Sequence, residues 1–131
     1  MRTMELRIVA AGLLFLFTLV SGVWLSNSGK PLNTAIFTVH KLIALATVIF
    51  TAIVIRDLLK NTPVQVVIVS LIVLAGLFAL ALFVTGALLS LGKPVNAVIL
   101  TIHAVTPFLL VISTAVTIYL LSSSKWQGFV S

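Results

Sequence analysis

Two histidines are the residues of this chain best suited to chemistry in apolar surroundings. His40 and His103 are the only histidines among 131 residues, and each lies within a long apolar segment. Ionisable side chains are costly inside a membrane, so those found there usually serve a function. One histidine from each side can ligate the iron of a flat macrocycle. We therefore take the two histidines as a candidate pair of ligands.

Other residue types offer little chemistry. The chain has no cysteine, which excludes disulfides, thiolate nucleophiles, thioether-attached haem and cysteine-bound iron–sulfur clusters. Its two acids, Glu5 and Asp57, supply carboxylate catalysis or proton-coupled transport poorly. Two imidazoles underfill a tetrahedral zinc site, and a copper ion completed by waters is a weaker alternative. We assign no catalytic residue.

A repeated motif places the two histidines in equivalent positions. The pattern Gly-Lys-Pro-x-Asn-x(4)-Thr-x-His occurs at 29–40 and again at 92–103, an offset of 63 residues. The segments before it match at an offset of 64, which pairs Gly22 with Gly86. Leucine and valine matches mean little in so apolar a chain, but this motif uses residues that are rare here. We interpret the chain as a tandem duplication with repeats at approximately 8–59 and 72–122.

Composition identifies the elements that carry the motif. The chain is 61% hydrophobic and only 8% charged, against about 25% charged residues in soluble domains, which argues against a soluble globular protein. Four stretches, 8–28, 31–55, 64–92 and 94–124, are long enough to cross a hydrocarbon core of about 30 Å. Short connections favour antiparallel neighbours. The predicted fold class is an all-α membrane protein: one four-transmembrane-helix up-down bundle over residues 1–131, built from two-helix repeats with pseudo-twofold symmetry.

Charge predicts the orientation of the spans. Five basic residues flank one side (Arg2, Arg7, Arg56, Lys60, Lys125) and two flank the other (Lys30, Lys93). The positive-inside rule then predicts a multi-pass protein of a prokaryotic-type cytoplasmic membrane, with both termini cytoplasmic. A basic start before an apolar stretch also fits a cleavable signal peptide, but the match between the first and third spans argues against cleavage.

The predicted bundle brings the histidines to one depth. Each lies seven residues past the matched asparagine, or roughly 10 Å into the membrane. Spans two and four lie on a diagonal of such a bundle, so the imidazoles can face each other. Two facing imidazoles suit the two faces of a planar macrocycle. The leading interpretation is one haem b per chain with His40 and His103 as axial iron ligands, and the alternative is two structural histidines hydrogen-bonded across the bundle.

Glycines and lysines near the same end are candidate haem contacts. Gly22 and Gly86 precede the outer loops by about as many residues as the histidines follow them. They either leave room for a porphyrin edge or allow close helix packing. Lys30 and Lys93 precede the two prolines of the motif. They either hold haem propionates at the outer mouth or anchor the chain at the interface.

Five polar residues nearer the histidines have less definite roles. Asn33 and Asn96 are either hydrogen-bonding residues at helix starts or propionate contacts. Lys41 follows the first histidine and needs an anion or a path to the interface, so a propionate is a candidate partner. Thr38 and Thr101 are expected to bond to helix backbone and to affect ligand orientation only indirectly.

Three prolines mark the second and fourth spans. Pro31 and Pro94 suit the first turn of a helix, so we expect those spans to begin there. Pro107 lies four residues beyond the second histidine and removes one helical hydrogen bond. A kink is expected at that point.

With these residues the chain resembles the four-helix b-type membrane cytochromes. The resemblance covers the four spans and rests on His40 and His103, and Gly22 and Gly86 give it additional support. It implies haem held between transmembrane helices by axial histidines, with electron exchange with a quinone or a redox protein. The partners so implied are the lipid bilayer and an electron carrier, and not nucleic acid. A homo-oligomer and a role as a subunit of a quinone-linked oxidoreductase stay open.

The resemblance has one departure and leaves two alternative functions. Two-haem members carry four ligands, whereas this chain has two histidines, which implies one haem near the outer face. A small transporter or channel uses similar repeats, but these spans hold few polar groups to line an aqueous path. A structural membrane subunit without haem needs none of this chemistry.

Overall fold

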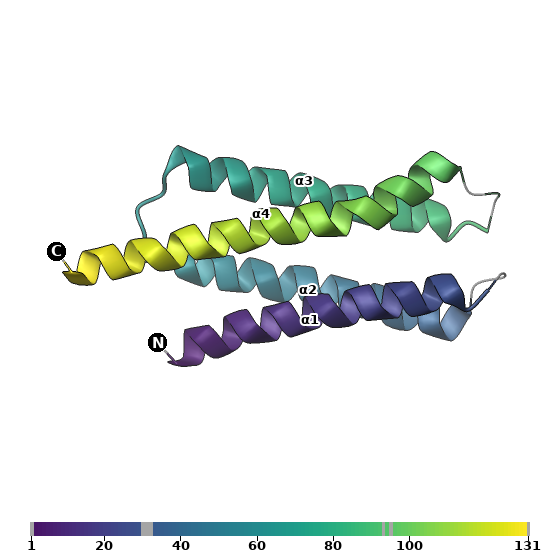
Figure 1. The fold of residues 1–131 in the computed structure, drawn as a ribbon, viewed down its shortest axis with the longest axis horizontal. Coiled ribbons are helices and arrows are strands. Elements are labelled where there is room, and N and C mark those ends of the chain that lie inside the picture. The colour runs from purple at the N-terminus through teal and green to yellow at the C-terminus, as the bar shows by residue number, and fades with distance from the viewer. Residues whose placement is uncertain (1, 30–32, 93, 95, 131) are drawn as a thin grey trace. The chain divides into compact units, whose positions relative to one another are not determined.

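The described part of the chain is helical. The computed structural model describes residues 2–29, 33–92, 94 and 96–130, with side chains to residue 123. Its elements are α1 (Arg2–Asn27), α2 (Thr34–Leu59), α3 (Val66–Leu89) and α4 (Ala97–Val130) (Figure 1). No strand occurs among these residues. The predicted all-α class with four long helices is confirmed.

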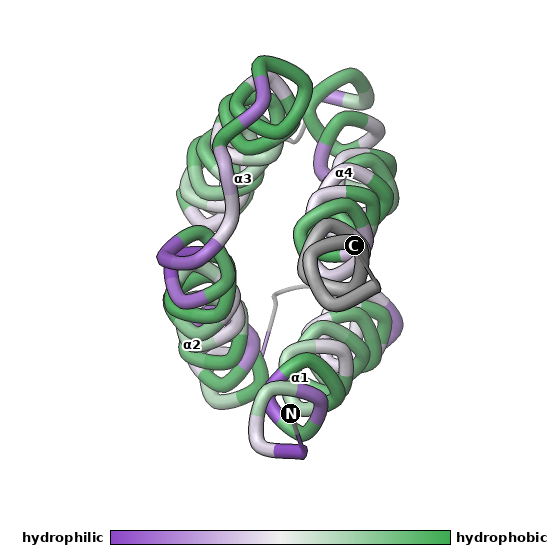
Figure 2. The backbone as a smooth tube through the Cα atoms, turned by 90° about the vertical axis from the view of Figure 1, so that its left-hand side faces the viewer, coloured by the Kyte–Doolittle hydropathy of each residue, from purple (hydrophilic) through white to green (hydrophobic). Residues whose placement is uncertain are grey.

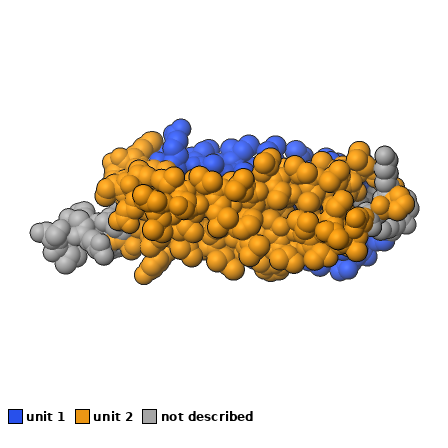
Figure 3. Space-filling model, turned by 90° about the horizontal axis from the view of Figure 1, so that it is seen from above, with its two compact units in different colours: residues 1–57 blue, residues 58–131 orange. Residues whose placement is uncertain are grey.

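Two compact units divide these helices. Unit 1 (Met1–Asp57) holds α1 and nearly all of α2, and unit 2 (Leu58–Ser131) holds the end of α2 with α3 and α4 (Figure 3). Within each unit, consecutive helices run in opposite directions (Figure 1). Each predicted repeat therefore corresponds to one antiparallel helix pair, while the symmetry between the repeats stays a prediction.

All four helices have the length and composition of membrane spans. The apolar segments Arg2–Asn27, Thr34–Leu59, Val66–Leu89 and Ala97–Ser123 contain 26, 26, 24 and 27 residues. At 1.5 Å per residue even the shortest measures about 36 Å, which exceeds a hydrocarbon core of about 30 Å. Figure 2 shows hydrophobic positions dominating each helix. These features indicate a multi-pass membrane protein.

Small and hydroxyl-bearing residues, more than large aliphatic ones, fill the buried positions. In unit 1 the Oγ1 atoms of Thr18 and Thr47 lie 2.9 Å apart and link α1 to α2. Each of these hydroxyls also lies within hydrogen-bond distance of a carbonyl one turn earlier in its own helix, so one of the two donates to the other hydroxyl in place of its carbonyl. Helices in lipid associate through close packing and such polar contacts, because lipid tails are as apolar as leucine side chains. The large aliphatic side chains accordingly stay mostly exposed on the outer faces.

Burial recurs at matched positions of the two predicted repeats. Four pairs from the alignment are buried in both members: Ala11 with Ala75, Ser21 with Thr85, Val54 with Thr117, and Leu58 with Leu121. The pairs follow the offsets of 64 and 63 residues read from the sequence. Matched positions therefore have similar environments.

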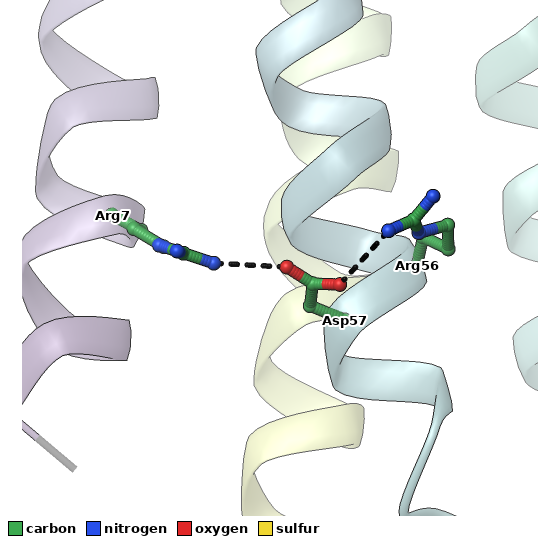
Figure 4. A network of polar contacts seen from close by, with 3 residues as sticks. All are labelled: Arg7, Arg56 and Asp57. Carbon is green, nitrogen blue, oxygen red and sulfur yellow. Dashed lines mark hydrogen bonds and ion pairs between the residues drawn. The ribbon is translucent and has the colours of Figure 1, made fainter.

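Helix α2 extends beyond its predicted end. Arg56 and Asp57, expected in a connection, belong to its last turn. Asp57 Oδ2 lies 2.9 Å from Arg7 Nη1 of α1, and its Oδ1 lies 3.6 Å from Arg56 Nη2 (Figure 4). The carboxylate of Asp57 is thus paired with two guanidinium groups, and the pair with Arg7 joins α1 to α2.

The starts of α2 and α4 correct a second expectation. Helix α4 begins at Ala97, so Pro94 precedes the helix and does not occupy its first turn. Helix α2 begins at Thr34, and Pro31 lies outside the described residues. Asparagine side chains accept the first backbone N–H groups at both starts, which is the stronger start signal. Helix α4 continues through Pro107.

Glycine explains the first position of the repeated motif. Gly29 and Gly92 have φ angles of +83° and +67°, and no other described residue has a positive φ. Glycine adopts this left-handed conformation without the steric cost that a Cβ brings, so the chain can turn away from the end of the preceding helix. Each turn redirects the backbone toward the helix that carries a histidine.

Candidate functional site

In unit 1, His40 of α2 forms a hydrogen bond with α1. Ser21 Oγ lies 2.9 Å from His40 Nδ1. The same hydroxyl donates to the Thr18 carbonyl at 3.0 Å. Ser21 is buried with 7% exposure, and His40 is half-buried. A buried hydroxyl of α1 therefore holds one nitrogen of the imidazole.

In unit 2, His103 of α4 makes the same contact with α3. Thr85 Oγ1 lies 2.8 Å from His103 Nδ1. Its hydroxyl donates to the Ala81 carbonyl at 2.7 Å. Thr85 is buried, again with 7% exposure, and His103 is half-buried. Each unit thus presents one imidazole held through Nδ1 by a hydroxyl of the neighbouring helix.

A glycine lies against each imidazole. A Cβ atom added to Gly22 would lie 3.0 Å from His40 Cε1, and one added to Gly86 would lie 3.3 Å from His103 Cε1. The imidazole itself takes up the space that the missing side chain leaves. Gly22 and Gly86 therefore lie at the level of the histidines, as their spacing about the loops predicts. Their predicted role beside a porphyrin edge stays a prediction.

The lysines predicted at this end fall into two groups. Lys30 and Lys93 lie outside the described residues. Lys41 is exposed, and its Nζ lies 4.1 Å from the centroid of the Phe37 ring. Phe37 is one turn nearer the start of α2, so the ammonium group extends along the helix toward that end, with a cation–π contact to the ring.

The two asparagines act at helix starts. Asn33 Oδ1 accepts the Ala35 N–H at 2.9 Å and the Ile36 N–H at 3.3 Å. Asn96 Oδ1 accepts the Val98 N–H at 2.9 Å. Of the two roles considered for these residues, the structure shows the helix-start hydrogen bond. A propionate contact stays a prediction.

The hydroxyls that contact the histidines were absent from the sequence-based candidates. Thr38 and Thr101, the hydroxyls considered there, each donate at 2.8 Å to a carbonyl one turn earlier in their own helix. Ser21 and Thr85 contact the imidazoles instead. A signal for them exists in the sequence, because each directly precedes a matched glycine and the offset of 64 pairs hydroxyl with hydroxyl.

Unit 1 also contains an apolar groove beside its histidine contact. The groove has a volume of about 390 Å³ and lies between α1 and the first turns of α2. Ser21 is the one hydroxyl residue in its lining. The lining consists of Phe17, Val20, Ser21, Trp24, Ala35, Ile36, Val39 and Ile43. The groove is therefore an apolar depression next to the residue that holds His40.

The remaining observations concern metal ligands and relatives. Among the described residues, no three histidine, cysteine or acidic side chains lie close enough together to hold a bare metal ion.

Comparison with protein-family models, curated proteins and solved structures finds no match for this chain. The two histidine contacts are accordingly the features of this chain that bear on its function.

Proposed function

We propose that this chain is a haem b-binding membrane cytochrome in which His40 and His103 supply the axial ligands through Nε2. The observation that carries the proposal is the repeated contact in which a buried hydroxyl holds Nδ1 of each imidazole, at 2.9 and 2.8 Å. Metal-ligating histidines nearly always use their other ring nitrogen for such a hydrogen bond. Two imidazoles, each held by a hydroxyl at Nδ1, match the two axial positions of haem iron.

The residues fit haem b in their chemistry. The ligand atoms on offer are nitrogens of neutral imidazoles, and the chain has no cysteine for covalent attachment. Each imidazole is half-buried in a long apolar helix, which suits an apolar macrocycle. Haem supplies one-electron chemistry when bound. The contribution of the chain is to orient the imidazoles and to exclude water.

The proposal includes a side of the membrane. Positive charge predominates at the two termini and in the α2–α3 connection, which supports a cytoplasmic location for all three. Each histidine then lies roughly 10 Å from the outer end of its helix. Electron exchange is therefore proposed with a quinone or a redox protein at the outer side. The groove that Ser21 lines supports a small apolar partner for unit 1.

The decisive experiment is the optical spectrum of the full chain, purified after expression with added haem precursor. We expect a six-coordinate low-spin haem b spectrum and one haem per chain by pyridine haemochrome assay. His40→Ala and His103→Ala should each remove the low-spin bands. Thr38→Ala and Thr101→Ala are matched controls, because those hydroxyls bond within their own helices.

Two results would count against the proposal. Full haem content and unchanged low-spin bands in both histidine variants would refute the ligand assignment. A wild-type chain without haem, despite an adequate supply, would refute haem binding and leave a transporter or a structural subunit as the better interpretation.

A further inference from the structure

The two hydroxyl contacts decide which nitrogen of each imidazole carries the proton. A neutral imidazole has one N–H donor and one acceptor nitrogen, and its hydrogen bonds select between the two tautomers. A hydroxyl can donate or accept, so its contact with Nδ1 alone leaves the direction open. The second partner of each hydroxyl settles it.

That second partner is a backbone carbonyl in both units. Ser21 Oγ lies 3.0 Å from the Thr18 carbonyl oxygen, and Thr85 Oγ1 lies 2.7 Å from that of Ala81. A carbonyl oxygen can only accept, and a hydroxyl has one hydrogen to give. For both contacts of one hydroxyl to be hydrogen bonds, its hydrogen goes to the carbonyl and its oxygen accepts the Nδ1–H of the imidazole.

The same preference appears at hydroxyls of this chain that have no histidine beside them. They donate to a carbonyl one turn earlier in their own helix, the usual partner of a serine or threonine inside a helix. Examples are Thr38, Thr101, Thr106 and Ser113. Ser21 and Thr85 therefore keep the ordinary direction of a helical hydroxyl and turn a lone pair toward the imidazole.

We propose that Ser21 and Thr85 are positioning residues that fix His40 and His103 in the Nδ1–H tautomer, so that Nε2 of each imidazole carries the lone pair that binds iron. The iron-binding part rests on the proposed function, whereas the tautomer part does not. The hydroxyl lets the imidazole keep its Nδ1 proton in apolar surroundings, and it strengthens the basicity of the opposite nitrogen. Neither residue touches the iron in this proposal.

The repeat supplies a built-in exchange experiment. Serine in unit 1 and threonine in unit 2 occupy matched positions and make the same two contacts. Ser21→Thr and Thr85→Ser should therefore keep the histidines in the Nδ1–H tautomer, because each variant keeps the acceptor oxygen. Ser21→Ala and Thr85→Val remove that oxygen with little change of volume, so they should weaken the hold on the Nδ1–H tautomer.

The first test uses the haem-free full chain in lipid nanodiscs. Nitrogen-15 NMR of labelled histidines distinguishes a protonated ring nitrogen from a bare one. We expect Nδ1–H for both histidines of the wild type. Ser21→Ala should shift His40 toward a mixture of tautomers and leave His103 unchanged, and Thr85→Val should do the reverse. In each variant the other histidine is the internal control.

The second test uses the haem-loaded chain and measures haem affinity and midpoint potential. Loss of a hydrogen-bonding partner behind a metal ligand typically weakens binding about 10–100-fold. Ser21→Ala and Thr85→Val should weaken haem binding by this amount and raise the midpoint potential, because a less basic imidazole stabilises ferric iron less. Ser21→Thr and Thr85→Ser should stay close to the wild type in both properties.

The outcomes separate this inference from the proposed function. Wild-type histidines in the Nε2–H form, or alanine and threonine at position 21 with equal effects on His40, would overturn the positioning role. A chain that binds no haem while its histidines show Nδ1–H would overturn the haem proposal and the iron-binding part, and would leave the tautomer assignment standing.

Discussion

At the scale of single residues, each histidine depends on a glycine and a hydroxyl that adjoin in sequence. Ser21 and Gly22 occupy successive positions of α1, so one holds the imidazole of His40 through Nδ1 while the other leaves space for its Cε1 edge. A hydrogen bond fixes the direction of the ring, and the missing Cβ fixes how closely it approaches the helix. Both requirements must be met at once, because a displaced ring loses the hydroxyl.

Alanine substitution of glycine tests this dependence. Gly22→Ala places a Cβ 3.0 Å from His40 Cε1, so we expect a loss of stability of about 1–3 kcal/mol from overpacking. Gly86→Ala, with 3.3 Å to His103 Cε1, should lose less. The measurement is the free energy of unfolding in detergent, together with haem content.

Two other helical glycines are matched controls for that experiment. A Cβ at Gly12 or Gly76 meets nothing within 4 Å. Alanine there should be neutral, or more stable by about 0.5–1 kcal/mol, because glycine is a poor helix former. Equal destabilisation of all four variants would show that contact with the imidazole is unimportant.

At the scale of the helices, sequence predicted which segments are helical better than where they end. Apolar length gave four spans, whereas Arg56 and Asp57 were assigned to a connection because charges usually leave the membrane there. In the structure both belong to the last turn of α2, and Asp57 bonds Arg7, which is 50 residues away in sequence. Local composition carries no information about such a partner.

The candidate site was also predictable only in part from the sequence. The repeated motif identified both histidines, and loop spacing placed Gly22 and Gly86 at their level. The hydroxyl partners were missed because a contact between helices depends on the rotation of each helix about its axis. None of the four helices has one side much more apolar than the other, so the sequence leaves that rotation undetermined. In the structure, the contacts of Ser21 and Thr85 with the two imidazoles show which sides of the helices face each other within each unit.

The ion pair between α1 and α2 yields a prediction at this scale. Asp57→Asn removes the charge that bonds Arg7 at 2.9 Å, and the Asp57 side chain is only 15% exposed. We expect unfolding in detergent to become easier by about 1–3 kcal/mol, the usual effect of losing a hydrogen bond to a charged group. Glu5→Gln, an exposed acid of α1, should change stability by less than about 0.5 kcal/mol. Similar losses in both variants would contradict a specific link.

At the scale of the whole molecule, the distribution of charge predicts orientation, and the absence of cysteine makes it measurable. Single cysteines can replace Ser28, in the α1–α2 connection, and Asn61, in the α2–α3 connection, both exposed. A membrane-impermeant thiol reagent added to intact cells should label the first and spare the second. The opposite pattern would invert the orientation and leave the helix pairs unchanged.

Orientation and the number of ligands together limit what an isolated chain can do. Both histidines follow the connections predicted to lie outside, and the opposite ends of the helices, as far as the structure describes them, carry no further histidine. The proposed haem would lie at this level, roughly 10 Å from the outer face and about 20 Å or more from the inner one. Electron exchange should therefore be fast at the outer side only.

In proteoliposomes that contain only this protein and no quinone, an external reductant should reduce the haem rapidly, whereas a reductant trapped inside should act far more slowly. Rapid transfer from an internal donor to an external acceptor would contradict the one-sided arrangement, and would require an oligomer that brings several haems into relay or a second electron carrier.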